Sequence, residues 1–305
     1  MSDGTRTWTV VALLKTTSDY FREKGAASPR VDAELLLAHL LGGRRIDLYL
    51  QHDRPVNGDE LARFREMVRR RASGKPVQRI TGGAEFYSIP FRVHDGVFIP
   101  RPETELLVDR GIEFLRDEGG EAPFAVDAGT GSGVIAVSLA KRIPRLRVEA
   151  TDRSPEAVLC ARENARLAGV EERVDVIETD LAAHLERLGA AADLVLSNPP
   201  YVTTAEMAEL PREVGEHDPS GALHGGEDGL LAIRPLIAAA AVALRPGGLL
   251  VFEASDATAA GAVAAVEETG LYESARVGRD LAGRLRVVEA RRIGAAPPVR
   301  QEEDR

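Results

Sequence analysis

The chain has 305 residues, of which 44% are hydrophobic and 29% charged, a composition typical of globular domains rather than of disordered, collagen-like or coiled-coil proteins. At about 150 residues per domain, this length favours two domains. The 39 basic and 48 acidic residues leave a net charge of −9, which argues against a protein that coats nucleic acid or anionic membranes by bulk charge. The single cysteine, Cys160, excludes an intramolecular disulfide and a cysteine zinc cluster. Without a long apolar run or a signal-peptide pattern, the sequence predicts a soluble, cytoplasmic protein with no membrane partner.

Residues 1–75 are expected to form a small helical domain. Apolar residues recur at helical spacing over residues 10–21, and Ser28-Pro29 begins a second apolar helix that ends at Gly42-Gly43. A third helix is expected over residues 59–72. Its outer face carries five arginines, which are Arg63, Arg65, Arg69, Arg70 and Arg71. We interpret this face as solvated; the alternative is a docking surface for an acidic or ribosome-bound partner.

Residues 76–97 are expected to form a hairpin linker, because the run from 86 to 93 is rich in aromatic and β-branched residues and is interrupted by Pro90. Over residues 98–293, strands alternate with helices, which predicts an α/β domain with a mostly parallel sheet covered on both faces. Strands are expected at residues 124–127, 146–152, 174–177, 193–197, 249–253 and 285–290. The tail, residues 294–305, is expected to be disordered.

A glycine-rich loop follows the first of these strands. It consists of Gly129, Thr130, Gly131, Ser132 and Gly133, and a helix is expected to begin directly after it. Glycines let the backbone turn tightly and let a ligand approach without meeting a Cβ. The G-x-G-x-G spacing is one residue tighter than the dinucleotide fingerprint, so a pyrophosphate cradle is not favoured.

Two aspartates follow the next two strands. Asp152 ends the second strand, where a carboxylate can accept both hydroxyls of a ribose. Its alternative role is a cap on the helix that Pro155 begins, but Ser154 is available for that. Asp180 follows the third strand, where it can reach the edge of an adenine or cap the next helix. Together with the glycine loop, Asp152 predicts a ligand that contains adenosine.

The segment Ser197-Asn198-Pro199-Pro200-Tyr201 follows the fourth strand. Ligands of open parallel sheets bind outside the carboxyl ends of the strands, so this segment is expected to face the glycine loop. Consecutive prolines make it stiff and leave backbone carbonyls free as acceptors, and Asn198 adds a side-chain carbonyl. Tyr201 offers a flat face for stacking. This set suits a planar NH2 group, either an amide or an exocyclic base amine; the alternative is a turn with a buried tyrosine.

This combination resembles S-adenosylmethionine-dependent methyltransferases that modify amino groups of planar systems. Further segments resemble the release-factor glutamine N(5)-methyltransferase family, known as HemK or PrmC; they are Phe98-Ile99-Pro100-Arg101-Pro102-Glu103-Thr104-Glu105, Glu85-Phe86-Tyr87, residues 28–37, 216–219 and 225–230. The resemblance covers roughly residues 8–292. It implies a Rossmann-like, seven-stranded methyltransferase domain behind a helical substrate-recognition domain. It also implies that the partner is a class 1 peptide chain release factor, methylated at the glutamine of its Gly-Gly-Gln motif.

The resemblance also implies roles for individual residues. It assigns the glycine loop to the methionine end of S-adenosylmethionine, Asp152 to the ribose, and Asp180 and Leu181 to the adenine side. Asn198, Pro199 and Tyr201 would be the catalytic group, Pro200 would join them in binding the target amide, and Asn198 would also touch the cofactor. The sequence departs from the family at Leu181, where some members carry an aromatic residue, and after Glu253, which is left without an assigned role.

Three alternatives stay open. A ribosomal-protein glutamine methyltransferase would share the segment from Asn198 to Tyr201. A nucleic-acid adenine methyltransferase is disfavoured by the net charge of −9 and by the lack of an obvious basic recognition domain, so no DNA partner is expected. A binding module without activity is disfavoured by the intact Asn198 and glycine loop. The six histidines show no metal-ligand spacing, and no metal is expected.

Overall fold

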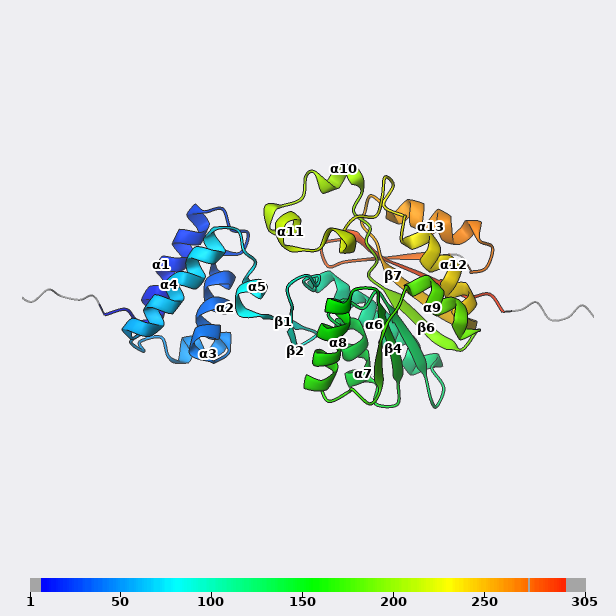
Figure 1. The fold of residues 1–305 in the computed structure, drawn as a ribbon, viewed down its shortest axis with the longest axis horizontal. Coiled ribbons are helices and arrows are strands. Elements are labelled where there is room, and N and C mark those ends of the chain that lie inside the picture. The colour runs from blue at the N-terminus through cyan, green and yellow to red at the C-terminus, as the bar shows by residue number, and fades with distance from the viewer. Residues whose placement is uncertain (1–6, 274, 295–305) are drawn as a thin grey trace, which may run out of the picture. The chain divides into compact units, whose positions relative to one another are not determined.

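The computed structural model describes residues 7–273 and 275–294, which divide into two compact units (Figure 1). The helical unit contains the described residues up to Gly83 together with Arg212–His217. The sheet unit contains Ala84–Pro211 and the described residues from Asp218 onward. The predicted domain borders after residues 75 and 97 remain predictions. Of the predicted disordered tail, only Gly294 lies within the described residues.

The first five helices of the helical unit pack around one apolar cluster. Its helices are α1 (Val10–Glu23), α2 (Pro29–Leu41), α3 (Arg45–Leu50), α4 (Gly58–Ala72), α5 (Val77–Thr81) and α11 (Arg212–His217). Local signals set their ends: Thr9 caps α1, and Asn57 and Glu60 form a capping box at α4. The cluster that they enclose includes Phe21, Leu36, Leu37 and Phe64.

One of the five arginines predicted to be solvated is instead buried. Arg71 is only 6% exposed; its Nε donates to Asp32 Oδ2 at 2.8 Å, and its Nη2 lies 2.6 Å from Glu213 Oε1. Because Arg71 follows the buried Phe64 by two helical turns, it points to the same inward face of α4. The interpretation of a solvated arginine face is therefore wrong for Arg71. Arg63, Arg65 and Arg69 are exposed, as both the solvated face and the alternative docking surface require.

In the described part of the chain, the sheet unit contains a seven-stranded sheet with the order β5-β4-β3-β6-β7-β9-β8. The strands are β3 (Phe124–Ala128), β4 (Arg147–Asp152), β5 (Val174–Glu178), β6 (Ala192–Ser197), β7 (Leu244–Glu253), β8 (Arg276–Arg279) and β9 (Leu285–Arg291). Strands β3 to β7 are parallel, and β9 runs antiparallel to both β7 and β8. The predicted α/β fold is confirmed. The sequence analysis missed β8, a short and largely exposed edge strand without an alternating apolar pattern.

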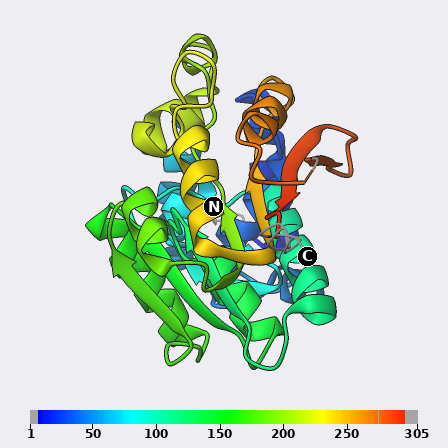
Figure 2. The same cartoon turned by 90° about the vertical axis from the view of Figure 1, so that its right-hand side faces the viewer.

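Helices cover both faces of this sheet (Figures 1 and 2). One face packs against α6 (Glu105–Glu118), α7 (Val134–Arg142) and α8 (Pro155–Leu167), together with the hairpin of β1 (Gly83–Phe86) and β2 (Ile89–Arg92). The other face packs against α9 (Leu181–Leu188), α12 (Ile233–Ala243) and α13 (Ala259–Glu268). The remaining short elements are η1 (Pro102–Thr104), α10 (Thr204–Met207) and η2 (Ser220–Ala222). Burial on both faces explains why the central strands are almost continuously apolar.

The topology brings the loops that carry the predicted site residues to one edge of the sheet, where the parallel strands end. In the strand register, Ala128 pairs with Thr151, Asp152 with Glu178, and Ser197 with Phe252, so the carboxyl ends of β3 to β7 lie side by side. The strand order reverses at β3, which pairs with β4 on one side and β6 on the other. In open parallel sheets, ligands bind in the crevice at such a reversal.

The described residues lack two kinds of special feature. None of their helices combines the length and apolarity that a membrane span requires. Within the same ranges, no group of three or more histidine, cysteine, aspartate and glutamate side chains is arranged to hold a metal ion. The expected lack of a metal and of a membrane partner stays a prediction.

Replacing Arg71 with alanine should destabilise the helical unit, because it leaves the buried Asp32 carboxylate without its partner. Breaking a buried ion pair costs about 3–5 kcal/mol. Native-state hydrogen exchange in α2 and α4 should show this loss as a lower free energy of opening. The matched control is Arg65→Ala on the exposed side of α4, expected to cost less than about 0.5 kcal/mol. Equal losses in the two variants would contradict the structural role of Arg71.

Candidate active site

A cavity of about 1030 Å³ lies at the carboxyl edge of the sheet. Most of the predicted site residues line it, namely Gly129, Thr130, Gly131, Ser132, Asp152, Asp180, Leu181, Asn198, Pro199 and Pro200. Two predicted residues, Gly133 and Tyr201, are not part of its lining. The lining also includes Phe98, Thr104 and Met207, to which the sequence analysis gave no role in a site. The structure thus brings the separately predicted segments together around one space.

The glycine loop leaves the end of β3 in a conformation that requires glycine. Gly129 and Gly131 have φ angles of 75° and 57°, whereas a Cβ at either position would meet no atom within 4 Å. Backbone conformation rather than lack of space therefore demands glycine here. The amides of Gly129 and Thr130 donate to the Thr151 carbonyl, each at 2.8 Å, and tie the loop to β4.

Asp152 is held beside this loop by two backbone amides. Its carboxylate accepts the N–H groups of Gly131 and Ser154, each at 2.9 Å. The cap on α8 is supplied by the Ser154 hydroxyl, which accepts the Ala157 amide at 3.2 Å. Each carboxylate oxygen can accept a second hydrogen bond, so Asp152 can still accept the hydroxyls of a ribose.

Asp180 caps the helix that follows it. Its Oδ1 accepts the amides of Ala182 and Ala183 at 3.0 and 3.2 Å, so the alternative role that the sequence left open is present in the structure. The cap uses one of the two carboxylate oxygens, and both Asp180 and Leu181 line the cavity. Capping is therefore compatible with contact to a ligand.

Asp127, the last acidic residue before the glycine loop, was not predicted as a site residue. It is fully buried, and its Oδ2 accepts the Thr130 hydroxyl at 2.6 Å and the Ala136 amide at 3.1 Å. Among the described residues, Oδ1 has no hydrogen-bond partner. Burial raises the pKa of Asp127 to about 6, against the opposing effect of both hydrogen bonds. A buried carboxylate directly behind the loop fits a positively charged ligand, because such a charge offsets the cost of burying it.

Asn198 belongs to a hydrogen-bond chain that the sequence analysis did not anticipate. Its Nδ2 donates to Thr104 Oγ1 at 3.1 Å, and Thr104 Oγ1 donates to Glu253 Oε2 at 2.7 Å. Tyr201 donates its hydroxyl to the other oxygen, Oε1, of Glu253 at 2.8 Å. Glu253 and Thr104 are 1% and 3% exposed. The available signal was the glutamate itself, a carboxylate that ends the apolar, buried second half of β7.

Tyr201 is fixed by this chain rather than exposed to the cavity. Its ring packs against the apolar cluster of α12 and α13, and burial together with the adjacent Glu253 raises the pKa of its hydroxyl. The predicted stacking of Tyr201 on a target group stays a prediction. The structure adds a supporting role through Glu253 that the sequence analysis did not include.

A second glycine segment holds the chain after Tyr201. Val202 donates its amide to the Leu223 carbonyl at 2.9 Å, and Gly225 donates to the Val202 carbonyl at 2.8 Å. Gly229 has a φ of 76°, and a Cβ there would lie 2.3 Å from Thr258 Cγ2 and 2.6 Å from the Tyr201 carbonyl oxygen. Both conformation and space therefore require glycine at this position.

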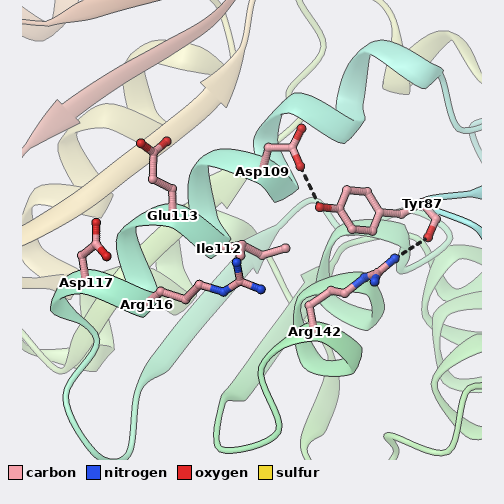
Figure 3. Close-up of a pocket in the computed structure, with 7 residues that line it drawn as sticks. All are labelled: Tyr87, Asp109, Ile112, Glu113, Arg116, Asp117 and Arg142. Atoms are coloured by element: carbon pink, nitrogen blue, oxygen red, sulfur yellow. Dashed lines mark hydrogen bonds between the residues drawn. The ribbon is translucent and has the colours of Figure 1, made fainter.

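A second hollow, of about 510 Å³, contains none of the predicted site residues and surrounds Tyr87 (Figure 3). The Tyr87 hydroxyl donates to Asp109 at 2.7 Å, and Arg142 donates to the Tyr87 carbonyl at 3.3 Å. Burial and Asp109 raise the pKa of Tyr87 to about 12. Tyr87 and Ser88 have φ angles of 53° and 60°, as in the tight turn of a two-residue hairpin. The predicted hairpin is confirmed, and these contacts hold its turn against α6 and α7.

Substituting alanine for Gly229 should displace the segment that follows Tyr201 and destabilise the sheet unit by about 3 kcal/mol or more, since strain at φ adds to a clash with backbone. The matched control is Gly283→Ala, at a φ of 81° with no atom within 4 Å of the added Cβ. Gly283→Ala should lower the free energy of unfolding only by the backbone strain, about 1–2 kcal/mol. Thermal unfolding of both variants measures the difference, and equal costs would contradict the close contact at Gly229.

Asp127→Asn should change how stability depends on pH. The pKa of Asp127, about 6 in the folded protein, exceeds its ordinary value of 3.8, so the folded state binds the proton more tightly. Wild-type protein therefore loses stability from this group as the pH rises from about 4 to 6. Asparagine still accepts from Thr130 and Ala136 but has no charge to bury. Relative to wild type, the variant should gain up to about 3 kcal/mol between pH 4 and 7 in urea unfolding. A difference that is constant across this range would contradict buried ionisation.

Comparison with known proteins supports one family for the whole chain. The family model described as "PrmC N-terminal domain" matches residues 12–82, and the one described as "Methyltransferase small domain" matches residues 89–213. Among solved structures, a T. thermophilus 16S rRNA N2 G1207 methyltransferase in complex with AdoMet and guanosine has a TM-score of 0.50 at 19% identity, covering 69% of this chain and 49% of that chain. This likeness shows the fold alone.

Relatives of known name extend the match over nearly the full length. A release factor glutamine methyltransferase of Rhodopirellula baltica is 41% identical over 283 residues, which cover 92% of this chain and 95% of the relative. One from Chlorobaculum tepidum is 45% identical over 253 residues, covering 81% and 86% of the two chains. The resemblance expected from the sequence is confirmed, and the chain belongs to the release factor glutamine methyltransferase family.

Proposed function

We propose that this protein transfers a methyl group from S-adenosylmethionine to the side-chain amide nitrogen of the glutamine in the Gly-Gly-Gln motif of class 1 release factors. It would thereby act in translation termination, in the cytoplasm. The observation that carries the proposal is the position of Asn198, Pro199 and Pro200 on the same cavity as the glycine loop and Asp152. The names of its relatives support the choice of substrate.

The residues around the cavity fit S-adenosylmethionine. The loop from Gly129 to Ser132 would hold its methionine end, Asp152 its ribose, and Asp180 with Leu181 its adenine side. Asp127 Oδ1, which has no hydrogen-bond partner among residues 7–273 and 275–294, suits a positively charged ligand, and Asp152 retains free acceptor capacity. A volume of about 1030 Å³ is at the upper end of the range for small-molecule sites, which leaves room for a glutamine side chain as well.

The bound cofactor supplies a methyl group that is already activated by the positive charge on sulfur. What the protein must supply is alignment, because the lone pair of an amide nitrogen is delocalised into its carbonyl. The Asn198 side-chain carbonyl and the Pro199 backbone carbonyl would accept the two N–H groups of the target amide. They would orient the lone pair toward the methyl carbon and stabilise the positive charge that develops on nitrogen as the N–C bond forms. The bond from the methyl carbon to sulfur would break at the same time, and its electron pair would neutralise the sulfonium. The extra proton leaves the nitrogen for water afterwards, so no strong base is needed.

We assign recognition of the release factor, away from the reacting glutamine, to the helical unit. Its surface carries side chains that are typical of protein interfaces. On α3, Ile46, Tyr49 and Leu50 are exposed, and α4 exposes Arg63, Arg65 and Arg69. Exposed apolar, aromatic and basic side chains on one unit are suited to contact with a protein partner.

Substrate choice can be tested directly against the alternatives. The protein would be incubated with labelled S-adenosylmethionine and, separately, with a class 1 release factor, ribosomal proteins and DNA. We expect label on the release factor alone. Label on ribosomal proteins or on adenine in DNA, with none on the release factor, would replace the proposal with the corresponding alternative.

Asn198→Ala should leave folding and most of the cofactor affinity intact but reduce turnover. Loss of one preorganised hydrogen-bond group costs about 2.7–4 kcal/mol, a factor of about a hundred to a thousand. Asn198→Asp keeps the shape but places a negative charge near the sulfonium. It should bind the cofactor at least as well as wild type and still react slowly, because the ground state gains more than the transition state. Single-turnover methylation, scored by the mass of the Gly-Gly-Gln peptide, is the measurement. A near-wild-type rate for Asn198→Ala would show that another group positions the amide.

A further inference from the structure

We propose that Thr104 and Glu253 are positioning residues that determine which end of the Asn198 side-chain amide faces the cavity. The inference rests on the proposed function, since it takes the Asn198 carbonyl as an acceptor for the target amide. It adds two residues that touch neither cofactor nor substrate in the proposed mechanism. Thr104 would act on the reaction through Asn198, and Glu253 would act through Thr104 and through Tyr201, whose hydroxyl it accepts.

The three residues come from distant parts of the sheet unit. Thr104 ends η1, Asn198 follows β6, and Glu253 ends β7. They form one line of hydrogen bonds, from Asn198 Nδ2 to Thr104 Oγ1 at 3.1 Å and from Thr104 Oγ1 to Glu253 Oε2 at 2.7 Å. The Tyr201 hydroxyl occupies the other oxygen of Glu253 at 2.8 Å. Both carboxylate oxygens therefore have a hydroxyl donor.

The direction of these bonds follows from counting hydrogens. An ionised carboxylate only accepts, so the hydroxyls of Thr104 and Tyr201 must both donate to Glu253. A hydroxyl has one hydrogen, which leaves Thr104 Oγ1 only lone pairs to offer to Asn198. Of the two ends of the Asn198 amide, the NH2 group alone can bond to it. The carbonyl oxygen is consequently turned away from Thr104 and is free to act as an acceptor.

A protonated Glu253 would allow the opposite arrangement. Its hydrogen can be donated to Thr104, whose own hydroxyl can then donate to the Asn198 carbonyl. The NH2 group of Asn198 would then be the free end, and it would oppose the NH2 group of a target glutamine. Burial raises the pKa of Glu253, and the nearby Glu103 acts in the same direction. The hydrogen bonds from Thr104 and Tyr201 and the charge of Arg286 oppose this shift. The net effect is a raised pKa of Glu253, and methyl transfer should be lost when acid protonates it.

Thr104→Val keeps the shape of the side chain but removes the hydroxyl. We expect the single-turnover rate of release-factor methylation to fall at least tenfold, while the dissociation constant for S-adenosylmethionine changes less than twofold. Thr104→Ser restores the hydroxyl and should react within threefold of wild type. The matched control is Thr258→Val, at another buried threonine of the sheet unit, which bonds to Ser255 instead. It should lower stability but not the rate. A Thr104→Val rate equal to that of Thr258→Val would overturn the inference.

Glu253→Gln tests the dependence on pH. Wild-type protein should lose rate toward acid pH, whereas Glu253→Gln should be slower at neutral pH and lack this acid limb. An unchanged acid limb in Glu253→Gln would contradict the role of Glu253.

One readout separates this inference from the proposed function. The side-chain NH2 resonances of Asn198, assigned by their loss in Asn198→Asp, should shift as wild-type protein is titrated with acid and should not do so in Glu253→Gln. The same resonances should be shifted in Thr104→Val relative to wild type, and in Thr104→Ser they should lie at their wild-type positions again. This pattern would support the positioning role whichever protein is the substrate, and its absence would refute that role even if release factors are methylated.

Discussion

A single buried carboxylate connects the segments that carry the proposed chemistry. Glu253 ends β7 with almost no exposure, and its two oxygens accept the hydroxyls of Thr104 and Tyr201. Burying a carboxylate is costly unless hydrogen bonds replace those it made with water. The two hydroxyls meet this need only if η1 and the segment that follows β6 both reach the end of β7. The requirement therefore fixes the loop that carries Asn198 to the sheet.

The rest of the sheet unit keeps this arrangement rigid. Parallel strands place the glycine loop, Asp152 and Asn198 at one edge, and the strand reversal at β3 opens the crevice between them. Behind the loops, Asp127 bonds to Thr130, and Gly229 allows the backbone to pass close to Tyr201. Acceptors held on rigid elements need little reorganisation during the reaction, which is the condition for effective electrostatic stabilisation.

Local patterns in the sequence were sufficient for the fold and for most of the cavity. Alternation of apolar strands and helices predicted the sheet, and residues next to strand ends, such as Asp152 and Asn198, lie where that topology puts them. Contacts between distant segments had no such signal. Periodicity placed Arg71 on a helix but could not show that Asp32 and Glu213 meet it. Likewise, nothing local to Glu253 indicates Thr104, 149 residues away. The edge strand β8 is too short and too exposed to show a pattern.

Neutron diffraction from crystals of the deuterium-exchanged protein can locate the hydrogens in the hydrogen-bond chain from Asn198 to Glu253, and so tests most directly how Asn198 is oriented. We expect deuterium on Asn198 Nδ2 pointing to Thr104 Oγ1, deuterium on Thr104 Oγ1 pointing to Glu253, and none on the Glu253 carboxylate at neutral pH. The Asn198 carbonyl oxygen would then face the cavity. A deuterated Glu253, or an Asn198 carbonyl bonded to Thr104 with its NH2 group in the cavity, would contradict this expectation.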